Sequence, residues 1–147
     1  MEKLKKQTIL FKDTLTISSS QTELEKIEQF SQRISKKALL SQEQSDNLAI
    51  VLTELVNNAI VHGNKGDVSK KVFLTAKIYQ NKVQISIRDQ GNSFDPSRLK
   101  DPTDPENLWK ETGRGLFIVK NLIDDIEFIP HEDGMEIVVT EYVEHLA

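Results

Sequence analysis

A polar seam runs through one apolar stretch of this chain and limits what the chain can fold into. Glu54, Asn58 and His62 follow one another at intervals of four residues, and residues at that spacing lie on the same face of an α-helix. Neighbouring apolar residues form the stripe that would face a core: Leu48, Val51, Leu52, Leu55, Val56, Ala59 and Ile60. Because Asn is a poor helix former, a solubilising face would more naturally carry Lys, Glu or Gln. The seam therefore predicts a helix whose polar edge serves a function.

The composition indicates an ordinary globular protein. For 147 residues, of which 37% are hydrophobic and 29% charged, we expect one domain, 1–147, with a single core. The absence of cysteine excludes disulfide scaffolds and thiolate chemistry. A net charge of -4 argues against nucleic acid as a direct partner. No apolar run is long enough to span a membrane, and the first residues do not resemble a secretory signal, so we expect a cytoplasmic protein.

The first half of the chain is expected to form one strand and two helices. Apolar residues between Ile9 and Ile17 keep a rough period of two, interrupted by the polar Asp13, and this suggests a strand. The sequences Ser20–Glu23 and Ser41–Gln44 are both typical of a capping box at the start of a helix. The second box would open the long helix that carries the polar seam. Gly63 stands where the C-cap of that helix is expected.

The second half combines two hairpins with an irregular segment. Residues 72–78 and 83–87 alternate apolar and polar side chains around a turn, which is typical of a β-hairpin. From Gly91 to Gly113 the chain has three prolines and little apolar content, so this segment is either a functional lid or disordered. The remaining patterns predict a helix over 115–124 and a hairpin with strands near 126–129 and 135–143, joined by Asp133-Gly134.

The order of these elements predicts the fold class. A strand, two helices, a hairpin, a loop, a helix and a final hairpin follow one another without an internal repeat. This order favours an α/β (α+β) two-layer sandwich, in which helices cover one face of a mostly antiparallel mixed sheet.

Two glycine motifs flank the irregular segment. Asp89-Gln-Gly91 ends a predicted strand with a carboxylate, which only accepts hydrogen bonds, beside a residue that allows close approach of a ligand. Gly113-Arg114-Gly115 precedes a predicted helix, where free backbone N–H groups and the helix dipole favour an anion. Each motif alone is weak evidence, because both also occur as plain turns. Their order behind the polar seam is more specific.

Taken in order, three motifs resemble the N, G1 and G2 boxes of the GHKL (Bergerat-fold) ATPases. They are ELVNNAIVHGN (54–64), DQGNSFDP (89–96) and GRGLFIV (113–119). Within that superfamily the chain looks like the anti-sigma-factor serine/threonine kinases of the RsbW and SpoIIAB type, from about Thr8 to Tyr142. The His-Gly-Asn end of the first box and the run 101–107 favour this branch over sensor histidine kinases. A sensor kinase would also carry a dimerisation helix with a phosphoacceptor histidine ahead of these motifs.

The resemblance implies a role for the residues of the first two boxes. Asn58 would be the protein ligand of Mg2+, with ATP phosphates and water completing the coordination. Glu54 would be the catalytic general base that acts on a serine or threonine hydroxyl of a protein substrate. Asp89 would accept a hydrogen bond from the adenine amine, and Gly91 would leave room for the ring.

Further nucleotide contacts follow from the same resemblance. Gly113, Arg114 and Gly115 would close over the phosphates as part of an ATP lid over about 92–113. The remaining residues expected to contact ATP are His62, Phe94 and Leu116. For some of these residues a second interpretation stays open: Arg114 could be a solvated lid residue, and His62 fits a helix-end residue near the lid or phosphates better than a metal ligand.

The sequence departs from the family pattern at two positions. Ser93 stands where many relatives have a second glycine, and Met135 stands where many have a threonine that helps to hold adenine. Met135 therefore bears on how the base would be held.

The resemblance implies a cytoplasmic, ATP-dependent serine/threonine kinase of a bacterial partner-switching system. Its expected partners are a STAS-domain anti-sigma-factor antagonist, a sigma factor and a second copy of the same chain. The alternative is a non-catalytic ATP-binding module that sequesters a regulator without phosphotransfer. Glu54 favours the kinase, whereas Met135 mildly favours the alternative.

Overall fold

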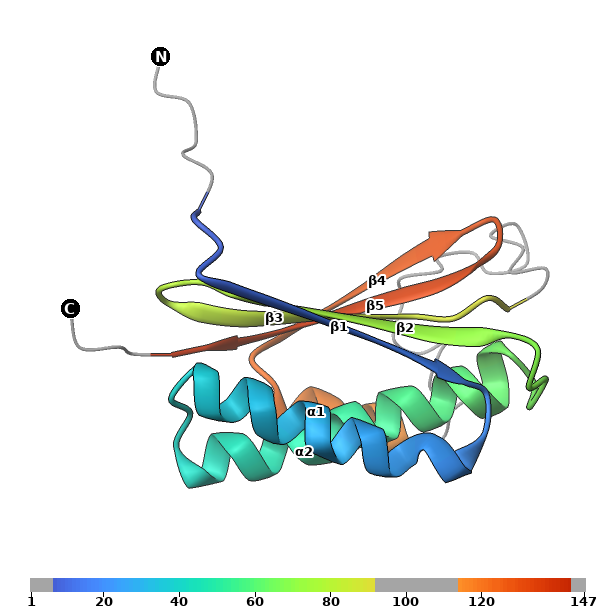
Figure 1. Ribbon diagram of the computed structural model, residues 1–147, viewed down its shortest axis with the longest axis horizontal. Coiled ribbons are helices and arrows are strands. Elements are labelled where there is room, and N and C mark those ends of the chain that lie inside the picture. Colours follow the sequence, from blue (N-terminus) through green and yellow to red (C-terminus); the bar gives the residue numbers. More distant parts are fainter. Residues whose placement is uncertain (1–6, 92–113, 144–147) are drawn as a thin grey trace, which may run out of the picture.

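The computed structural model describes residues 7–91 and 114–143, and its framework is a twisted sheet of five strands (Figure 1). Strands lie in the order β1-β2-β3-β5-β4, and each adjacent pair is antiparallel. The strand bounds are β1 Phe11–Ser18, β2 Lys71–Ile78, β3 Lys82–Arg88, β4 Asp125–His131 and β5 Gly134–Tyr142. The expected mixed character of the sheet is therefore absent among the described strands.

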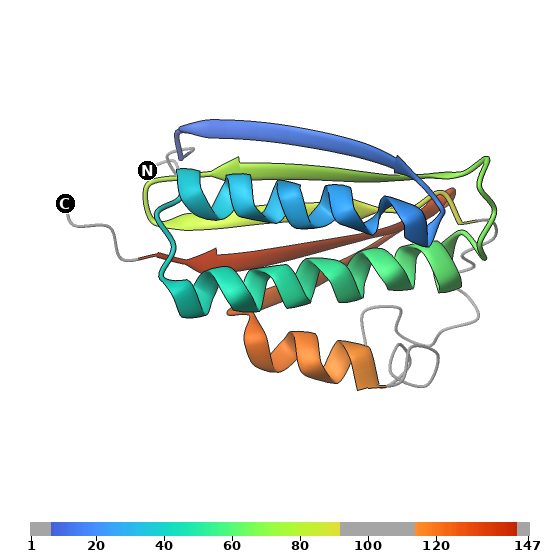
Figure 2. The same cartoon turned by 60° about the horizontal axis from the view of Figure 1, so that its bottom comes forward.

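The helices lie together on one face of this sheet (Figure 1 and Figure 2). α1 and α2 pack against each other, and α4 packs on the far side of α2. The bounds are η1 Gln21–Glu23, α1 Leu24–Lys37, α2 Gln42–Asn58, η2 Ala59–Gly63 and α4 Arg114–Leu122. The two-layer sandwich predicted from the element order is thus confirmed. In the part of the chain that the structure describes, no helix is long and apolar enough to cross a membrane.

The core lies between the two layers. Alternate residues of β2 and β3, such as Leu74 and Ile85, are buried against α1 and α2. The helices contribute Phe30 and Ile34 from α1, and the apolar stripe predicted for α2 is buried. Because side chains alternate across a strand, the opposite face of the sheet carries the polar residues. Helix α2 is therefore held firmly, with its polar seam at the border of the core.

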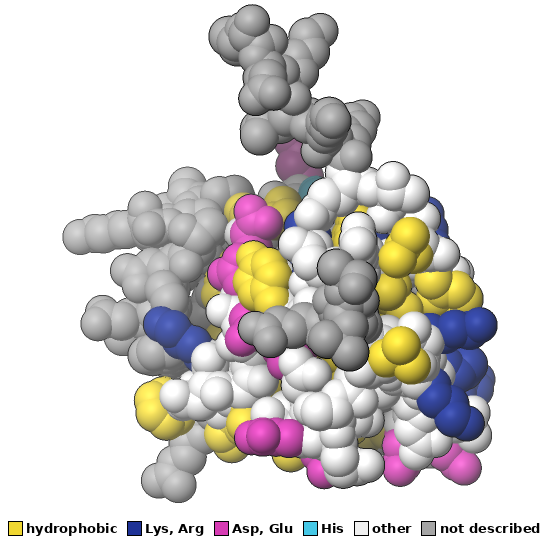
Figure 3. All heavy atoms as spheres, turned by 90° about the vertical axis from the view of Figure 1, so that its left-hand side faces the viewer, with side chains coloured by type: hydrophobic (Ala, Val, Ile, Leu, Met, Phe, Trp, Pro, Cys, Tyr) yellow, Lys and Arg dark blue, Asp and Glu magenta, His cyan; other side chains and the backbone are white. Residues whose placement is uncertain are grey.

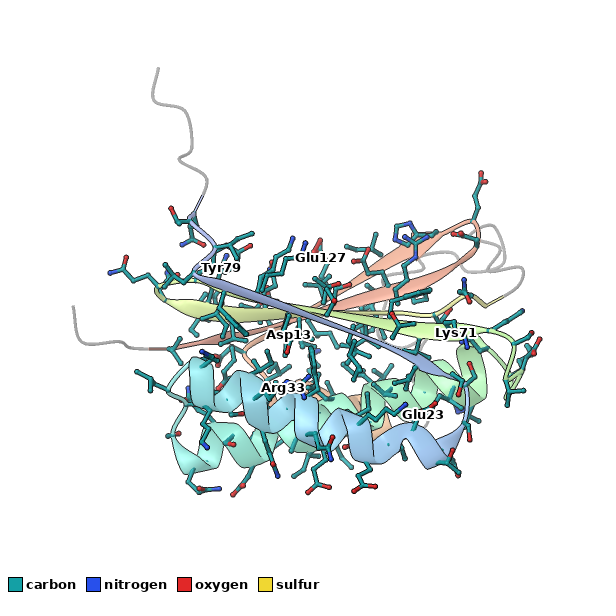
Figure 4. All side chains as sticks on the ribbon, viewed as in Figure 1. Asp13, Glu23, Arg33, Lys71, Tyr79 and Glu127 are labelled. Atoms are coloured by element: carbon teal, nitrogen blue, oxygen red, sulfur yellow. The ribbon has the colours of Figure 1, made fainter. Side chains whose placement is uncertain are left out.

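An ion pair explains the polar residue that interrupts the first strand. Asp13 occupies the inward phase of β1, between Phe11 and Leu15. Its carboxylate accepts a hydrogen bond from Arg33 Nε of α1 at 3.2 Å, and Figure 4 shows the two side chains on facing elements. Since the strand lies at the sheet edge and the pair is half exposed, the charges stay hydrated. Asp13 therefore interrupts the apolar pattern without breaking the strand.

The two predicted capping boxes have different outcomes. At Ser41, the side chain accepts from Gln44 N (3.1 Å) and Gln44 Oε1 accepts from Ser41 N (3.2 Å), so this box is confirmed. At Ser20, the box prediction is wrong: Ser20 Oγ accepts from Thr22 N at the start of a short 3-10 turn. Glu23 turns away instead and accepts from Ser18 Oγ at 2.9 Å. The tighter turn moves Glu23 out of reach of the N-cap backbone.

Candidate functional site

The helix that carries the polar seam changes its winding just after Asn58. α2 ends there, and Ala59–Gly63 continue as a π-helical turn, in which Asn64 N donates to Ala59 O at 2.8 Å. A π-turn bonds residues five apart and holds more residues per turn than an α-helix. His62 lies on this turn and is exposed, whereas Glu54 and Asn58 are partly buried. Its contact with the nucleotide stays a prediction.

Gly63 is needed for close approach and not for a C-cap. Positive backbone φ angles occur later, at Lys65 (54°) and Gly66 (71°), and the C-cap of the π-turn is Asn64. A methyl group at Gly63 would overlap the carboxylate of Asp89. The C-cap prediction for Gly63 is thus wrong, since packing against the end of β3 requires the glycine.

Glu54 and Asn58 lie against the start of α4. A methyl group at Gly115 would stand 2.7 Å from Glu54 Oε2 and 3.6 Å from Asn58 Nδ2. Gly115 therefore allows the backbone of the G2 motif to lie directly on the polar seam. Asn58 Nδ2 is buried and has no hydrogen-bond partner among the described residues. An unsatisfied buried amide of this kind is typical of a ligand site.

Asp89 forms the second centre of the site, just beyond the end of β3. Its side chain is only 6% exposed. Oδ1 accepts from Gly91 N at 2.9 Å and from Met135 N at 3.1 Å. Burial raises the pKa of the Asp89 carboxyl above its usual value, and the bonds from Gly91 and Met135 oppose that rise. Among the described residues, no protein donor bonds Oδ2, so this oxygen can accept from a ligand.

Glycines surround Asp89 on the backbone side. At Gly134, φ is 152° and a methyl group would overlap the backbone carbonyl oxygen of Asp89. Gly91 lies against the carbonyl oxygen of Gly63 in the same way. The hairpin β4–β5, the π-turn and the end of β3 can converge on Asp89 because these positions have no side chain.

Asn64 is a structural centre for which the sequence predicts no role. Its side chain is 1% exposed. Nδ2 donates to Ser19 Oγ (2.7 Å) and to Lys71 O (2.9 Å), while Oδ1 accepts from Gln90 N (2.8 Å). A carboxamide directly after Gly63 is the local signal, because Ser19 and Gln90, two of its three partners, lie far away in the chain.

The site is a strip along α2 and the π-turn. Glu54 and Asn58 face Gly115 at one end, and Gly63 faces Asp89 at the other. Gly63 follows Glu54 by nine positions, which corresponds to roughly 13 Å along a helix axis. The strip is thus long enough for an extended ligand with a hydrogen-bonding base at one end and charged groups at the other.

Four further predicted residues add less to the described site. Phe94 and Gly113 lie outside the described residues, as does the predicted lid, and Arg114 is placed only as the first residue of α4. Leu116 is 2% exposed and belongs to the hydrophobic core, where it anchors α4. Any contact of Leu116 with a ligand would therefore come from its backbone.

Comparison with known proteins finds a family model and several relatives. The family model of the histidine kinase-like ATPase domain matches residues 17–140. The serine-protein kinase RsbW of Listeria monocytogenes serovar 1/2a is 28% identical over 116 residues, which are 75% of this chain and 73% of the relative. RsbW of Bacillus thuringiensis is 31% identical over 105 residues, or 67% of this chain and 64% of the relative.

Solved structures share the fold at low sequence identity. The structure of the RsbU and RsbW domains of Rv1364c from Mycobacterium tuberculosis has a TM-score of 0.66 at 14% identity, covering 89% of this chain and 32% of that one. The catalytic domain of the histidine kinase ThkA, in a nucleotide-free form, has a TM-score of 0.55 at 14% identity, covering 88% of this chain and 97% of that one. These likenesses establish the sandwich architecture.

Proposed function

Because this chain belongs to the histidine kinase-like ATPase domain family, we propose that it is an ATP-dependent serine/threonine protein kinase. The observation that carries the proposal is the contact of Gly115 with both Glu54 and Asn58. It puts a carboxylate and an unsatisfied amide at the N-terminus of α4, where backbone N–H groups favour phosphate.

Asp89 would recognise the adenine base by accepting a hydrogen bond from it. Its Oδ1 is held by two backbone amides, so the carboxylate cannot rotate freely, and Oδ2 stays available to accept from the exocyclic amine. Guanine has a carbonyl oxygen at that position, and two acceptors facing each other repel. The geometry therefore favours ATP over GTP.

Asn58 would hold the Mg2+ ion that accompanies ATP. No group of three or more His, Cys, Asp or Glu side chains converges among the described residues, whereas the buried amide of Asn58 has an unused polar atom. The oxygen and nitrogen of a carboxamide are interchangeable by rotation, so Asn58 can present its oxygen. When bound, Mg2+ would neutralise phosphate charge, with phosphates and water as its other ligands.

Glu54 would act on the protein substrate. As a general base it would take the proton from a serine or threonine hydroxyl while that oxygen forms a bond to the γ-phosphorus. The bond from the γ-phosphorus to the bridging oxygen breaks, and ADP leaves with that oxygen. The products are a phosphorylated side chain, ADP and a protonated Glu54.

The protein substrate would be a STAS-domain anti-sigma-factor antagonist, and a sigma factor would be the second partner. The likeness to proteins named serine-protein kinase RsbW supports a protein substrate, and these two partners are the ones that the family resemblance implies. This chain would then phosphorylate the antagonist and sequester the sigma factor in turn, as in a bacterial partner-switching system.

A homodimer is the proposed assembly. The sheet face without a described helix carries Lys12 and Lys77 opposite each other on β1 and β2, and Glu127 on β4, which points away from the helices in Figure 4. A second copy related by a twofold axis could place basic strands over acidic ones. At the end of the molecule near the β2–β3 turn, a group of Lys and Arg side chains also gathers along one edge (Figure 3).

The alternative is a module that binds ATP and traps a regulator without phosphotransfer. Met135 favours it, because its backbone N–H is used by Asp89 and its side chain lacks the hydroxyl of the threonine found in many relatives. A base held without that hydroxyl could bind more weakly or at a different angle.

One experiment distinguishes the kinase from the non-catalytic alternative. Glu54→Gln keeps the size of the side chain beside Gly115 but cannot accept a proton. We expect it to bind ATP and a STAS-domain antagonist encoded by a neighbouring gene as the wild type does. Transfer of labelled phosphate to the antagonist should fall by a factor of about 100 or more. If neither protein transfers phosphate but both bind the antagonist in an ATP-dependent way, the non-catalytic alternative is correct.

A further inference from the structure

Asn64 joins three strand ends through one buried side chain. It contacts Ser19 just after β1, Lys71 at the start of β2 and Gln90 just after β3, with all three distances between 2.7 and 2.9 Å. The end of β3 is also bonded to β2, since Lys71 N donates to Gln90 Oε1 at 2.7 Å. The three side-chain hydrogen bonds of Asn64 thus reach three different segments at the ends of the strands.

Two neighbouring pairs of residues connect this cluster to the candidate site. Gly63 directly precedes Asn64 and packs on the carboxylate of Asp89. Gln90 directly follows Asp89, and its amide donates to Asn64 Oδ1. The π-turn and the end of β3 are thus in contact at adjacent positions, once through packing and once through a hydrogen bond.

We propose that Asn64 is a positioning residue, which holds Asp89 at a set place relative to Glu54 and Asn58. This inference rests on the proposed function, in which Asp89 binds adenine and Asn58 binds the phosphate-bound metal. Because α2 carries Glu54 and Asn58 and continues into the π-turn that ends at Asn64, a bond from Asn64 to the chain after Asp89 couples the two halves of the site. Asn64 itself does not contact the nucleotide.

Loss of the side chain should displace the adenine half only. In Asn64→Ala, Gln90 N loses its partner, and the segment from Asp89 to Gly91 can move away from Gly63. Glu54, Asn58 and Gly115 keep their mutual contacts, since none of them touches Asn64 in the described structure. A residue that only stabilised the fold would leave the selectivity of the folded fraction unchanged.

Calorimetry on folded protein at low temperature tests this difference. We expect Asn64→Ala to bind ATP about tenfold more weakly and to lose most of its preference for ATP over GTP. Its affinity for Mg-triphosphate, which lacks the base, should stay within about twofold of wild type. Unchanged selectivity in folded Asn64→Ala, or an equal loss for ATP and Mg-triphosphate, would overturn the inference.

Ser19→Ala is the matched control. It removes one acceptor of Asn64 on the β1 side and leaves the bond to Gln90 in place. We expect this variant to melt at a lower temperature and to keep the ATP preference of wild type. If it loses that preference as Asn64→Ala does, the bond to Gln90 is not the determinant.

If Asn64→Ala does not fold, hydrogen exchange on wild type tests the bond on which the proposal rests. Gln90 is an exposed residue, and its amide donates to Asn64, so its hydrogen exchange reports this bond. We expect slow exchange at Gln90 without nucleotide, and rapid exchange there would contradict the proposal. Asp89→Asn distinguishes failure of the proposed function from failure of the inference about Asn64. If wild type binds ATP no better than Asp89→Asn, the proposed function itself is wrong.

Discussion

At the scale of the residue, the site depends as much on absent side chains as on present ones. Asp89 is approached by backbone from Gly63 and Gly134, and Glu54 by backbone at Gly115. The atoms that an added methyl group would contact differ between these glycines. At Gly115 they belong to the flexible end of Glu54, whereas at Gly134 they belong to the backbone carbonyl of Asp89. Substitutions at these glycines should therefore separate loss of activity from loss of stability.

Gly134→Ala should be strongly destabilising. The new methyl group would overlap the carbonyl oxygen of Asp89, and φ at this position is 152°. We expect a loss of about 3 kcal/mol in the free energy of unfolding, measured by urea denaturation. Gly66→Ala is the control, because φ is 71° but nothing lies within 4 Å, and it should cost about 1 kcal/mol. Equal costs would show that conformation alone, without the contact to Asp89, explains the glycine.

A buried carboxyl at the other end of β5 should make stability depend on pH. Burial, with the negative charge of Asp124 as the second cause, raises the pKa of Glu141 from 4.5 to about 7. Glu141 is 7% exposed, and its Oε1 accepts from Gln44 Nε2 of α2 at 3.2 Å. Because the folded pKa lies above the unfolded one, this contribution to stability is full below pH 4.5 and is lost as pH rises through 7.

Glu141→Gln tests this dependence. The amide cannot ionise, so the melting temperature of the variant should fall less than that of wild type between about pH 5 and 8. At pH 8 the variant should be the more stable of the two. Parallel melting curves over this pH range would show that Glu141 does not titrate there.

At the scale of the element, α2 is the part that links core and site. Its apolar stripe is buried, its N-terminus is closed by a capping box, and its C-terminus widens into the π-turn that reaches Asp89. Helical period and capping residues are local signals and were readable in the sequence. The π-turn could not be predicted from the sequence, because the bond from Asn64 N to Ala59 O competes with an α-helical bond of similar strength. The tertiary packing of Gly63 and Asn64 decides which of the two bonds forms.

The two predicted capping boxes should differ in their contribution to stability. Ser41→Ala removes an N-cap bond to Gln44 N, so we expect a loss of about 1 kcal/mol. Ser20→Ala removes a longer bond of 3.3 Å to Thr22 N in a single 3-10 turn, and its cost should be smaller. Chemical denaturation of both variants provides the comparison. A larger effect at Ser20 would contradict the assignment of the only true box to Ser41.

At the scale of the whole molecule, ATP would connect the helix layer to the sheet. Asn58 belongs to α2, whereas Asp89 follows β3, so a ligand that contacts both stabilises the packing of one layer on the other. At a concentration 100 times its dissociation constant, such a ligand adds about 2.7 kcal/mol to stability. For a chain of this size this corresponds to a rise of roughly 5–10 °C in melting temperature.

Thermal melts with nucleotide check this coupling. We expect Mg-ATP to raise the melting temperature of wild type and to have little effect on Asp89→Asn. In Asn58→Ala, ATP should stabilise to the same small extent with or without Mg2+. An equal shift in all three proteins would show that the ligand binds elsewhere.

The amino-acid sequence alone determined the element order, the two-layer class and the residues of the polar seam. These features depend on periods of two and 3.6 residues and on short motifs, which are complete within a few neighbouring positions. The tertiary structure decided the contacts between distant segments. Examples are the ion pair of Asp13 with Arg33, the packing of Gly63 and Gly134 on Asp89, and the bond from Gln90 to Asn64. The raised pKa of Glu141 also depends on a distant residue, Asp124. Such contacts depend on strand register and on the docking of helices, which no local pattern encodes.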